Sequence, residues 1–294
     1  MAFALHAHPT VGFLLAANRD EALDRPTAPL HRWHTPAGTP VLAGRDLQEG
    51  GTWLGCTPGG RVALLTNVRE APPFARWPRS RGELATRWLD TALRTTDARQ
   101  ASADFIAELG PQALAYSGFN LVLGDVVQGH WVWLNNRPDV VTPDLLDTLQ
   151  PQLWRPHPAL LAATLLPGVY GLSNAGLDTP WPKTQALKQA LVQAIARPEP
   201  DHRMLWDALS DRRPAPDAEL PRTGVPTDWE RALSAVWVDM PGHAGPLGYG
   251  TRSSVVMQVR HSPSWQVEMT EHTWRPPAHA GRVCETWSID APTA

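Results

Sequence analysis

The sequence lacks the features that would place it in several large classes of protein. No apolar run is long enough to span a bilayer, and residues 1–9 have neither the basic start nor the long apolar stretch of a cleavable signal. The net charge is −3 and no block of like charge occurs, which argues against nucleic acid or an anionic membrane surface as a partner. The only cysteines, Cys56 and Cys284, cannot build a disulfide framework. We therefore expect a cytoplasmic protein that does not insert into membranes.

Several common catalytic signatures are also absent. The chain contains no GxSxG elbow, no P-loop and no dinucleotide-binding GxGxxG. The spacings of His6 with His8 and of His31 with His34 could suit a metal, but His and Cys pairs with zinc-finger spacing are missing. We therefore expect surface or core histidines and no metal site. Cys56 could act as a nucleophile, although a lone cysteine is more often a small buried residue.

What the chain does contain fits a globular protein with a large core. Its 294 residues are 43% hydrophobic, and no internal repeat or low-complexity tract divides them, so we expect one domain over residues 1–294. The 30 prolines indicate many ordered loops. The 14 tryptophans indicate apolar grooves or broad packing surfaces.

The alternation of apolar and polar residues predicts mainly antiparallel strands with two groups of helices. Strands are expected at 3–5, 11–18, 61–66, 119–125, 130–134, 168–174, 232–239, 253–259 and 265–271. Helices are expected at 98–109, at 204–209, and from an opening at 178–183 to about residue 196. Another helix is expected after Ser80, because Glu83 completes a capping box. Residues 248–252 are read as a turn and residues 211–228 as a mobile loop. Neighbouring strands pair in this interpretation, which favours a layered α+β sandwich.

Polar side chains follow several of the predicted strands. Arg19 and Asp20 follow the apolar run 11–15, Asn67 ends strand 61–66, and Asn174 ends strand 168–174. Arg252 follows a glycine-containing turn. Arginine binds carboxylates through a planar fork of donors, aspartate can orient an amine or accept its proton, and amides can stabilise an oxyanion. These residues together would suit an acyl-transfer pocket.

Eight motifs give the chain a resemblance to the NRDE family, also called the transport and Golgi organisation 2-like family. In family order they are AANRDE (16–21), RPT (25–27), GGTWLG (50–55), LLTNVRE (64–70), SRGEL (80–84), GFNLVLGD (118–125), YGLSNAGLDTPWPK (170–183) and YGTRSS (249–254). The resemblance implies a four-layer αββα sandwich similar to N-terminal nucleophile hydrolases of the bile salt and penicillin V acylase branch.

The same resemblance assigns roles to individual residues. It implies that Arg19 and Asp20 take the catalytic strand positions, Asn67 and Asn174 the amide positions, and Arg252 that of the later arginine. Neighbouring motif residues are expected to contact substrate, namely Asn18, Trp53, Thr66 and Arg69.

The sequence departs from the family at its start. Members that resemble it begin with Met followed by Cys, and removal of Met exposes both a thiol and an α-amino group that titrates near ~7.7–8.0. Here Met1 is followed by Ala2, which has no nucleophilic atom. A misassigned start and a real loss of the nucleophile both explain this difference. The printed chain is not expected to run the family's reaction unless Cys56 substitutes.

Two functions therefore remain open. The first is hydrolysis of an amide C–N bond, which needs no cofactor. The second is binding or carriage of a ligand, because eukaryotic relatives are implicated in haem mobilisation and in lipid or acyl-CoA homeostasis. In that case Arg19 and Arg252 could pair with ligand carboxylates, and His6, His8, His31 and His34 are candidate haem ligands. Both hypotheses predict a small-molecule partner, and both leave the oligomeric state open.

Overall fold

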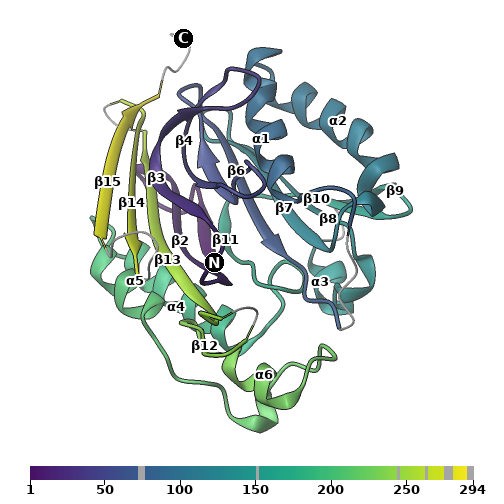
Figure 1. Cartoon of the computed structure of the whole chain (residues 1–294). Coiled ribbons are helices and arrows are strands. Elements are labelled where there is room, and N and C mark those ends of the chain that lie inside the picture. The colour runs from purple at the N-terminus through teal and green to yellow at the C-terminus, as the bar shows by residue number, and fades with distance from the viewer. Residues whose placement is uncertain (72–76, 150–151, 244–245, 262–263, 275–280, 290–294) are drawn as a thin grey trace.

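The computed structural model describes residues 1–71, 77–149, 152–243, 246–261, 264–274 and 281–289. They form two antiparallel sheets that face each other, with helices on the outer face of each sheet (Figure 1). The predicted α+β class, antiparallel sheets and four-layer αββα sandwich are therefore confirmed. No helix in the described ranges is both long and apolar enough to cross a membrane.

The first sheet holds the start of the chain. Its seven strands are β1 (Ala2–Leu5), β2 (Val11–Ala22), β11 (Gly168–Gly171), β12 (Asp239–Met240), β13 (Tyr249–Arg260), β14 (Gln266–Thr273) and β15 (Gly281–Ser288). Their order is β11-β1-β2-β13-β14-β15, and β12 pairs with β13. The predicted N-terminal hairpin is present, with Ala2 opposite Ala16. Strand β1 is bonded on both edges, so the chain terminus is fixed between β2 and β11.

In the second sheet the order of the strands nearly matches their order along the chain. Its eight strands are β3 (Thr27–His34), β4 (Pro40–Asp46), β5 (Leu54–Cys56), β6 (Arg61–Asn67), β7 (Phe119–Asp125), β8 (His130–Asn135), β9 (Leu153–His157) and β10 (Leu160–Thr164). Their order is β3-β4-β5-β6-β7-β8-β10-β9. The predicted hairpin of β7 and β8 turns at Gly129, whose positive φ of 61° favours glycine.

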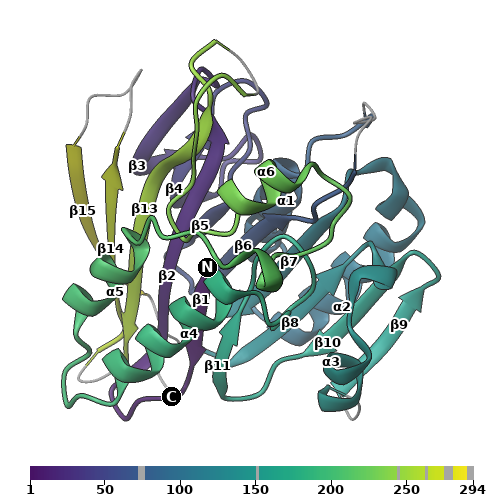
Figure 2. The same ribbon diagram turned by 90° about the horizontal axis from the view of Figure 1, so that it is seen from below.

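Three apolar clusters separate the four layers. The helices are α1 (Gly82–Asp90), α2 (Ala98–Leu109), α3 (Pro143–Thr148), α4 (Pro182–Ile195), α5 (His202–Leu209) and α6 (Thr227–Ala232). Apolar residues of α1 and α2 pack on the second sheet, and those of α4 and α5 pack on the first (Figures 1 and 2). The third cluster fills the space between the sheets and includes Phe13 and Trp131, whose rings stack at 4.9 Å.

Three local predictions differ from the structure. No capping box forms at α1, because the Glu83 carboxylate accepts from Tyr116 Oη and pairs with Arg79 instead. The predicted strand 232–239 is wrong, since α6 ends at Ala232 and only Asp239 begins a strand. The predicted turn 248–252 is also wrong, because β13 already begins at Tyr249. In the segment 211–228, whose mobility stays a prediction, the amide of Ala215 donates to Ser234 Oγ at 2.8 Å.

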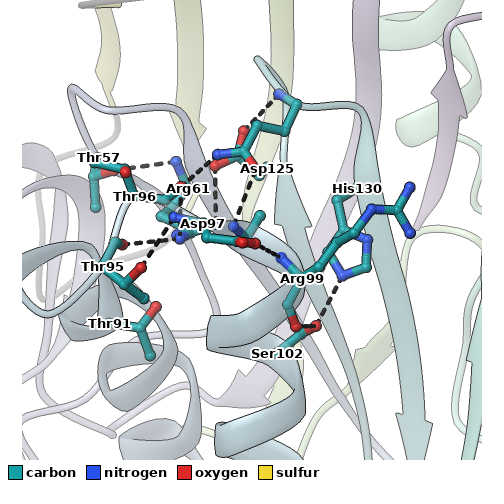
Figure 3. A network of polar contacts seen from close by, with 12 residues as sticks. Thr57, Arg61, Thr91, Thr95, Thr96, Asp97, Arg99, Ser102, Asp125 and His130 are labelled. Carbon is teal, nitrogen blue, oxygen red and sulfur yellow. Dashed lines mark hydrogen bonds and ion pairs between the residues drawn. The ribbon is translucent and has the colours of Figure 1, made fainter. Parts of the chain in front are cut away.

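A buried polar network joins α2 to the second sheet (Figure 3), and its Arg61 lies at the opposite end of β6 from Asn67. Arg61 on β6 pairs with Asp125 on β7 at 2.9 Å, and its guanidinium also donates to the carbonyl of Thr95. The Ser102 hydroxyl on α2 lies 2.8 Å from His130 Nε2. The side chains of Arg61 and Asp125 are only 2% and 3% exposed, so each satisfies the other's buried charge.

Candidate functional site

The polar strand ends predicted from the sequence meet around a cavity between the two sheets. This first cavity has a volume of about 280 Å³. Strand β2 contributes Arg19 and Asp20, strand β6 contributes Asn67, and the segment after β11 contributes Asn174. Met1 lines the same cavity, and Figure 2 shows the N-terminus at the end of β1 beside β2. Four of the five predicted catalytic residues are therefore brought together.

Arg19 points across the gap between the sheets. Its Cζ lies 4.1 Å from the ring centroid of Trp53, and Nη2 lies 3.5 Å from the carboxylate of Glu21. Burial lowers the pKa of Arg19, while the charge of Glu21 opposes that shift. Trp53, predicted to bind substrate, also lines the first cavity. An aromatic ring under a guanidinium holds its plane in a fixed orientation.

Successive residues of β2 point to opposite faces, so Asn18 and Asp20 lie on the other side from Arg19. The Asp20 carboxylate accepts from Thr251 Oγ1 at 2.6 Å, which leaves its second oxygen available. Asn18 differs, because its Nδ2 donates to the carbonyls of Leu209 and Val236, both at 2.9 Å. Both amide hydrogens of Asn18 are thus used within the protein. Asn18 also lines the first cavity, and its contact with substrate stays a prediction.

Asn174 and Asn67 are held together although they come from different sheets. Asn174 Nδ2 donates to the Asn67 carbonyl at 3.0 Å, and the Arg69 amide donates to the Asn174 carbonyl at 2.7 Å. Thr66 is part of the same contact, since its hydroxyl donates to the Ser173 carbonyl at 2.8 Å. The side-chain amide of Asn67 forms no hydrogen bond within the described part of the chain and lines the cavity.

Two predicted residues lie elsewhere. Arg252 lines neither cavity described here; its guanidinium donates to the backbone carbonyls of Ala22 and Arg25 and so fixes the segment after β2. Arg69 lines a second cavity, where its guanidinium donates to Glu230 at 2.5 Å. Burial is the largest influence on the pKa of each arginine and lowers it.

The structure also adds polar residues that the strand-end pattern did not include. Tyr249 Oη donates to the Asp20 carbonyl at 3.1 Å. Arg81, at the start of α1, donates to Ser117 Oγ at 3.3 Å and lines both cavities. Lys183 lies on the first turn of α4 and lines the first cavity. Arg81, Lys183 and Tyr249 lie in the SRGEL, YGLSNAGLDTPWPK and YGTRSS motifs. These motifs were the sequence signal that could have identified the three residues as part of the site.

The second cavity adjoins the first and is larger, with a volume of about 830 Å³. The two share six lining residues, namely Arg25, Asn67, Ser80, Arg81, Asn174 and Tyr249. The apolar part of the wall of the second cavity includes Val68, Trp77, Val225, Trp229, Leu233 and Met240. A polar chamber therefore opens beside a partly apolar one, an arrangement that suits a ligand with one polar and one apolar end.

The alternative nucleophile and the candidate haem ligands lie outside both cavities. Cys56 is 1% exposed within the inter-sheet core, and burial raises the pKa of its thiol to about 12. A thiol in that state is a poor nucleophile at neutral pH. The four predicted histidines line neither cavity, namely His6, His8, His31 and His34. His243 does line the second cavity, beside the ring of Trp229. The described residues contain no cluster of three or more side chains that could hold a metal ion.

Comparison with known proteins identifies the family. The profile of the family "Transport and Golgi organisation 2" matches residues 1–276. The chain belongs to this family. It is 32% identical over 261 residues to the human transport and Golgi organization protein 2 homolog, covering 84% of this chain and 81% of the human one. The mouse homolog is 29% identical over 251 residues with the same coverage.

Solved structures with a similar course of the chain include two acylases. Penicillin V acylase from Agrobacterium tumefaciens matches with a TM-score of 0.44 and 10% identity, covering 97% of this chain and 85% of the other. The C2A mutant of conjugated bile acid hydrolase from Clostridium perfringens matches with a TM-score of 0.45 and 9% identity, covering 100% and 94%.

Proposed function

We propose that the first cavity of this member of the transport and Golgi organisation 2 family binds an amide and hydrolyses its C–N bond once a nucleophile is supplied at the start of β1. The observation that carries the proposal is the meeting of Asp20, Asn67 and Asn174 beside the end of β1. These side chains come from both sheets, so the fold brings them together from distant parts of the chain. They provide an acceptor for a proton and amide donors for the oxygen of a reacting carbonyl.

Each residue has a separate part in this reaction. The Asn67 side chain, which has no partner in the described part of the chain, donates to the oxyanion that forms as the carbonyl is attacked. Asn174 fixes Asn67 through its 3.0 Å contact with the Asn67 carbonyl. The free oxygen of Asp20 orients the attacking group or its amine. Arg19, held over Trp53, adds positive charge beside the reacting group.

The register of β1 supports one place for the nucleophile that this reaction needs. Cys56 cannot serve, because it lies in the core away from the cavity. Ala2 pairs with Ala16 in antiparallel register. If β1 is extended backwards in the same register, a residue added two positions before Met1 lies opposite Arg19 on β2. Met1 packs toward the inter-sheet core while Ala2 faces the helices, so the added residue shares the side of Met1.

The test is a chain that begins Cys-Ala-Met1, compared with matched chains that begin Ser-Ala and Ala-Ala. Each is assayed with hexanoyl p-nitroanilide, whose cleavage releases a coloured amine. The Cys form is expected to hydrolyse the anilide, and Asn67→Ala in that form should lower kcat about 10²–10³-fold. A Cys form that is no faster than the Ala form contradicts the proposal.

The second cavity favours one alternative, a carrier role for an apolar planar ligand such as haem. Its volume of about 830 Å³, the Trp77 and Trp229 side chains and the nearby guanidinium of Arg81 support this role. His243 is the histidine placed to approach such a ligand, and its Nδ1 already contacts the Pro241 carbonyl at 3.0 Å. Haem titration should give a Soret shift that weakens in His243→Ala and in Arg81→Met. A flat titration removes haem as a ligand.

A further inference from the structure

Lys183 occupies a position that is electrostatically unfavourable in three ways. It is the second residue of α4, and a cation near the N-terminus of a helix opposes the helix dipole. Its side chain is partly buried, and its ammonium forms no ion pair or hydrogen bond with the described residues. Lys188 on the same helix shows the ordinary alternative, since its Nζ pairs with Asp178 at 2.8 Å. Nothing in the packing of α4 requires an ammonium at residue 183.

The surroundings of Lys183 contain unmet hydrogen-bond donors. Lys183 Nζ lies 6.0 Å from the ring centroid of Trp181, and Arg69 Cζ lies 4.9 Å from the same centroid. The Arg69 side chain is 9% exposed, and its Nη2 is buried without an acceptor. A buried donor without a partner costs about 1–3 kcal/mol. Arg69 lines the second cavity, so in the first cavity the donor that an acceptor oxygen of a ligand would satisfy is the Lys183 ammonium.

The charges around Lys183 favour a neutral acceptor over an anion. Asp20 on β2 faces Lys183 from across the first cavity without contacting it, and Glu230 on α6 acts from further away. The Arg69 guanidinium is a nearby positive group, whereas burial lowers the pKa of the Met1 α-amino group to about 5 and leaves that amine largely neutral at pH 7. A carboxylate between Lys183 and Asp20 would be repelled by Asp20. A carboxamide fits better, because its oxygen accepts from Lys183 and its N–H can donate to Asp20.

We propose that the Lys183 ammonium donates a hydrogen bond to the carbonyl oxygen of an amide ligand held between Lys183 and Asp20. The inference rests on the proposed function for its choice of an amide. In hydrolysis, the C–N bond breaks after attack on the carbonyl carbon, and negative charge develops on this oxygen until the bond is broken. The ammonium stabilises that charge without transferring a proton, so Lys183 must be protonated to act.

Protonation of Lys183 is controlled by its place in the cavity. Burial lowers the pKa of Lys183 to about 8, the charge of Asp20 opposes the shift, and that of Arg69 adds to it. A hydrogen bond from the ammonium to a ligand oxygen favours the charged form, so amide binding should raise this pKa. Binding should accordingly weaken as the pH rises through the titration of Lys183.

The chain offers an unusually clean test, because Lys183 and Lys188 are its only lysines. Reductive ¹³C-methylation labels these two amines and the N-terminus, and Lys183→Arg and Lys188→Arg assign the signals. Hexanamide is the probe. It should shift the Lys183 signal, move its titration midpoint to higher pH and leave the Lys188 signal in place. Lys183→Met should weaken hexanamide binding about ten- to hundred-fold, Lys183→Arg less, and Lys188→Met not at all.

Two results of this experiment would overturn the proposal. A Lys183 signal that hexanamide does not move overturns the proposal. A shift with hexanoate but not with hexanamide also overturns it, because the site would then be one for carboxylates. The measurement reads binding alone, so a chain beginning Cys-Ala-Met1 that fails to hydrolyse anilides would count against the proposed reaction without affecting this result.

Discussion

The side chain of Asn174 donates to the backbone carbonyl of Asn67 across 3.0 Å, and this contact joins the first sheet to the second at the edge of the first cavity. The Arg69 amide returns a hydrogen bond to the Asn174 carbonyl at 2.7 Å. The two sheets are thus connected at the point where their polar strand ends meet. The position of Asn67, and hence of its unpaired amide, depends on Asn174.

Replacement of Asn174 by alanine should separate function from stability. The lost hydrogen bond should lower the free energy of unfolding by only about 0.5–1.5 kcal/mol, because its surroundings are open to water. Hydrolysis by the chain that begins Cys-Ala-Met1 should fall at least tenfold, since Asn67 is no longer fixed. Urea unfolding and the anilide assay measure the two effects, with the exposed Gln100→Ala as control. Unchanged hydrolysis would show that the contact does not position Asn67.

Glu230 should be necessary for the stability of the fold, because its carboxylate neutralises the buried guanidinium of Arg69. Their side chains are 9% and 5% exposed and 2.5 Å apart, so Glu230→Gln leaves a buried guanidinium without a counter-charge. We expect a loss of about 3–5 kcal/mol in the free energy of unfolding. Adding Arg69→Met should restore part of that loss in urea unfolding. Asp217→Asn on the exposed pair with Arg231 is the control and should change little. A double variant less stable than Glu230→Gln would contradict this explanation.

The two cysteines should differ sharply in reactivity. Cys284 is exposed, whereas Cys56 lies in the inter-sheet core with a pKa raised to about 12 by burial. Ellman's reagent at pH 8 should therefore titrate one thiol in the folded protein and both in denaturant. In Cys284→Ser the folded protein should show no reactive thiol. Rapid reaction of Cys56 in that variant would reopen its role as a nucleophile.

His130 should make stability depend on pH. Burial lowers its pKa, and the charge of Arg99 lowers it further, so the folded state prefers the neutral ring. The unfolded chain then binds more protons, and the stability contributed by His130 is present above its unfolded pKa of ~6.5 and lost as the pH falls below it. Unfolding free energies at pH 7 and pH 5 should therefore differ less in His130→Gln than in the natural chain. An equal difference between pH 7 and pH 5 in the two proteins would show that His130 is not the origin of this pH dependence.

Sequence patterns predicted a layered α+β sandwich of antiparallel strands correctly, because alternation and apolar runs reflect burial directly. They did not predict the strands β3, β4, β9, β10 and β15. Asn67 ends β6 and Asn174 follows β11, whereas Arg19 and Asp20 lie within β2, which continues to Ala22 beyond the predicted end at residue 18. All four residues line one cavity. Their chemical roles stay predictions. The strand-end pattern could not include Lys183, which reaches the cavity from a helix.

Glycine explains the error at residues 248–252. Gly248 has a positive φ of 88° and does form a turn, but Gly250 is required for a different reason. A Cβ at Gly250 would lie 2.7 Å from the Val238 carbonyl oxygen, so this glycine allows close approach of two backbones inside the sheet. Composition alone cannot separate these two uses of glycine. Arg252 was consequently expected in the cavity, whereas β13 directs its guanidinium to backbone carbonyls.

The most direct test of the account is the intact mass of the chain that begins Cys-Ala-Met1 after brief mixing with hexanoyl p-nitroanilide. The proposed reaction predicts a protein heavier by one hexanoyl group, located at the added cysteine and absent from the Ser-Ala and Ala-Ala chains. The adduct should form more slowly when Asn67 is replaced by alanine. A Cys form that stays unmodified while it binds hexanamide would contradict amide hydrolysis in the first cavity and favour a carrier role.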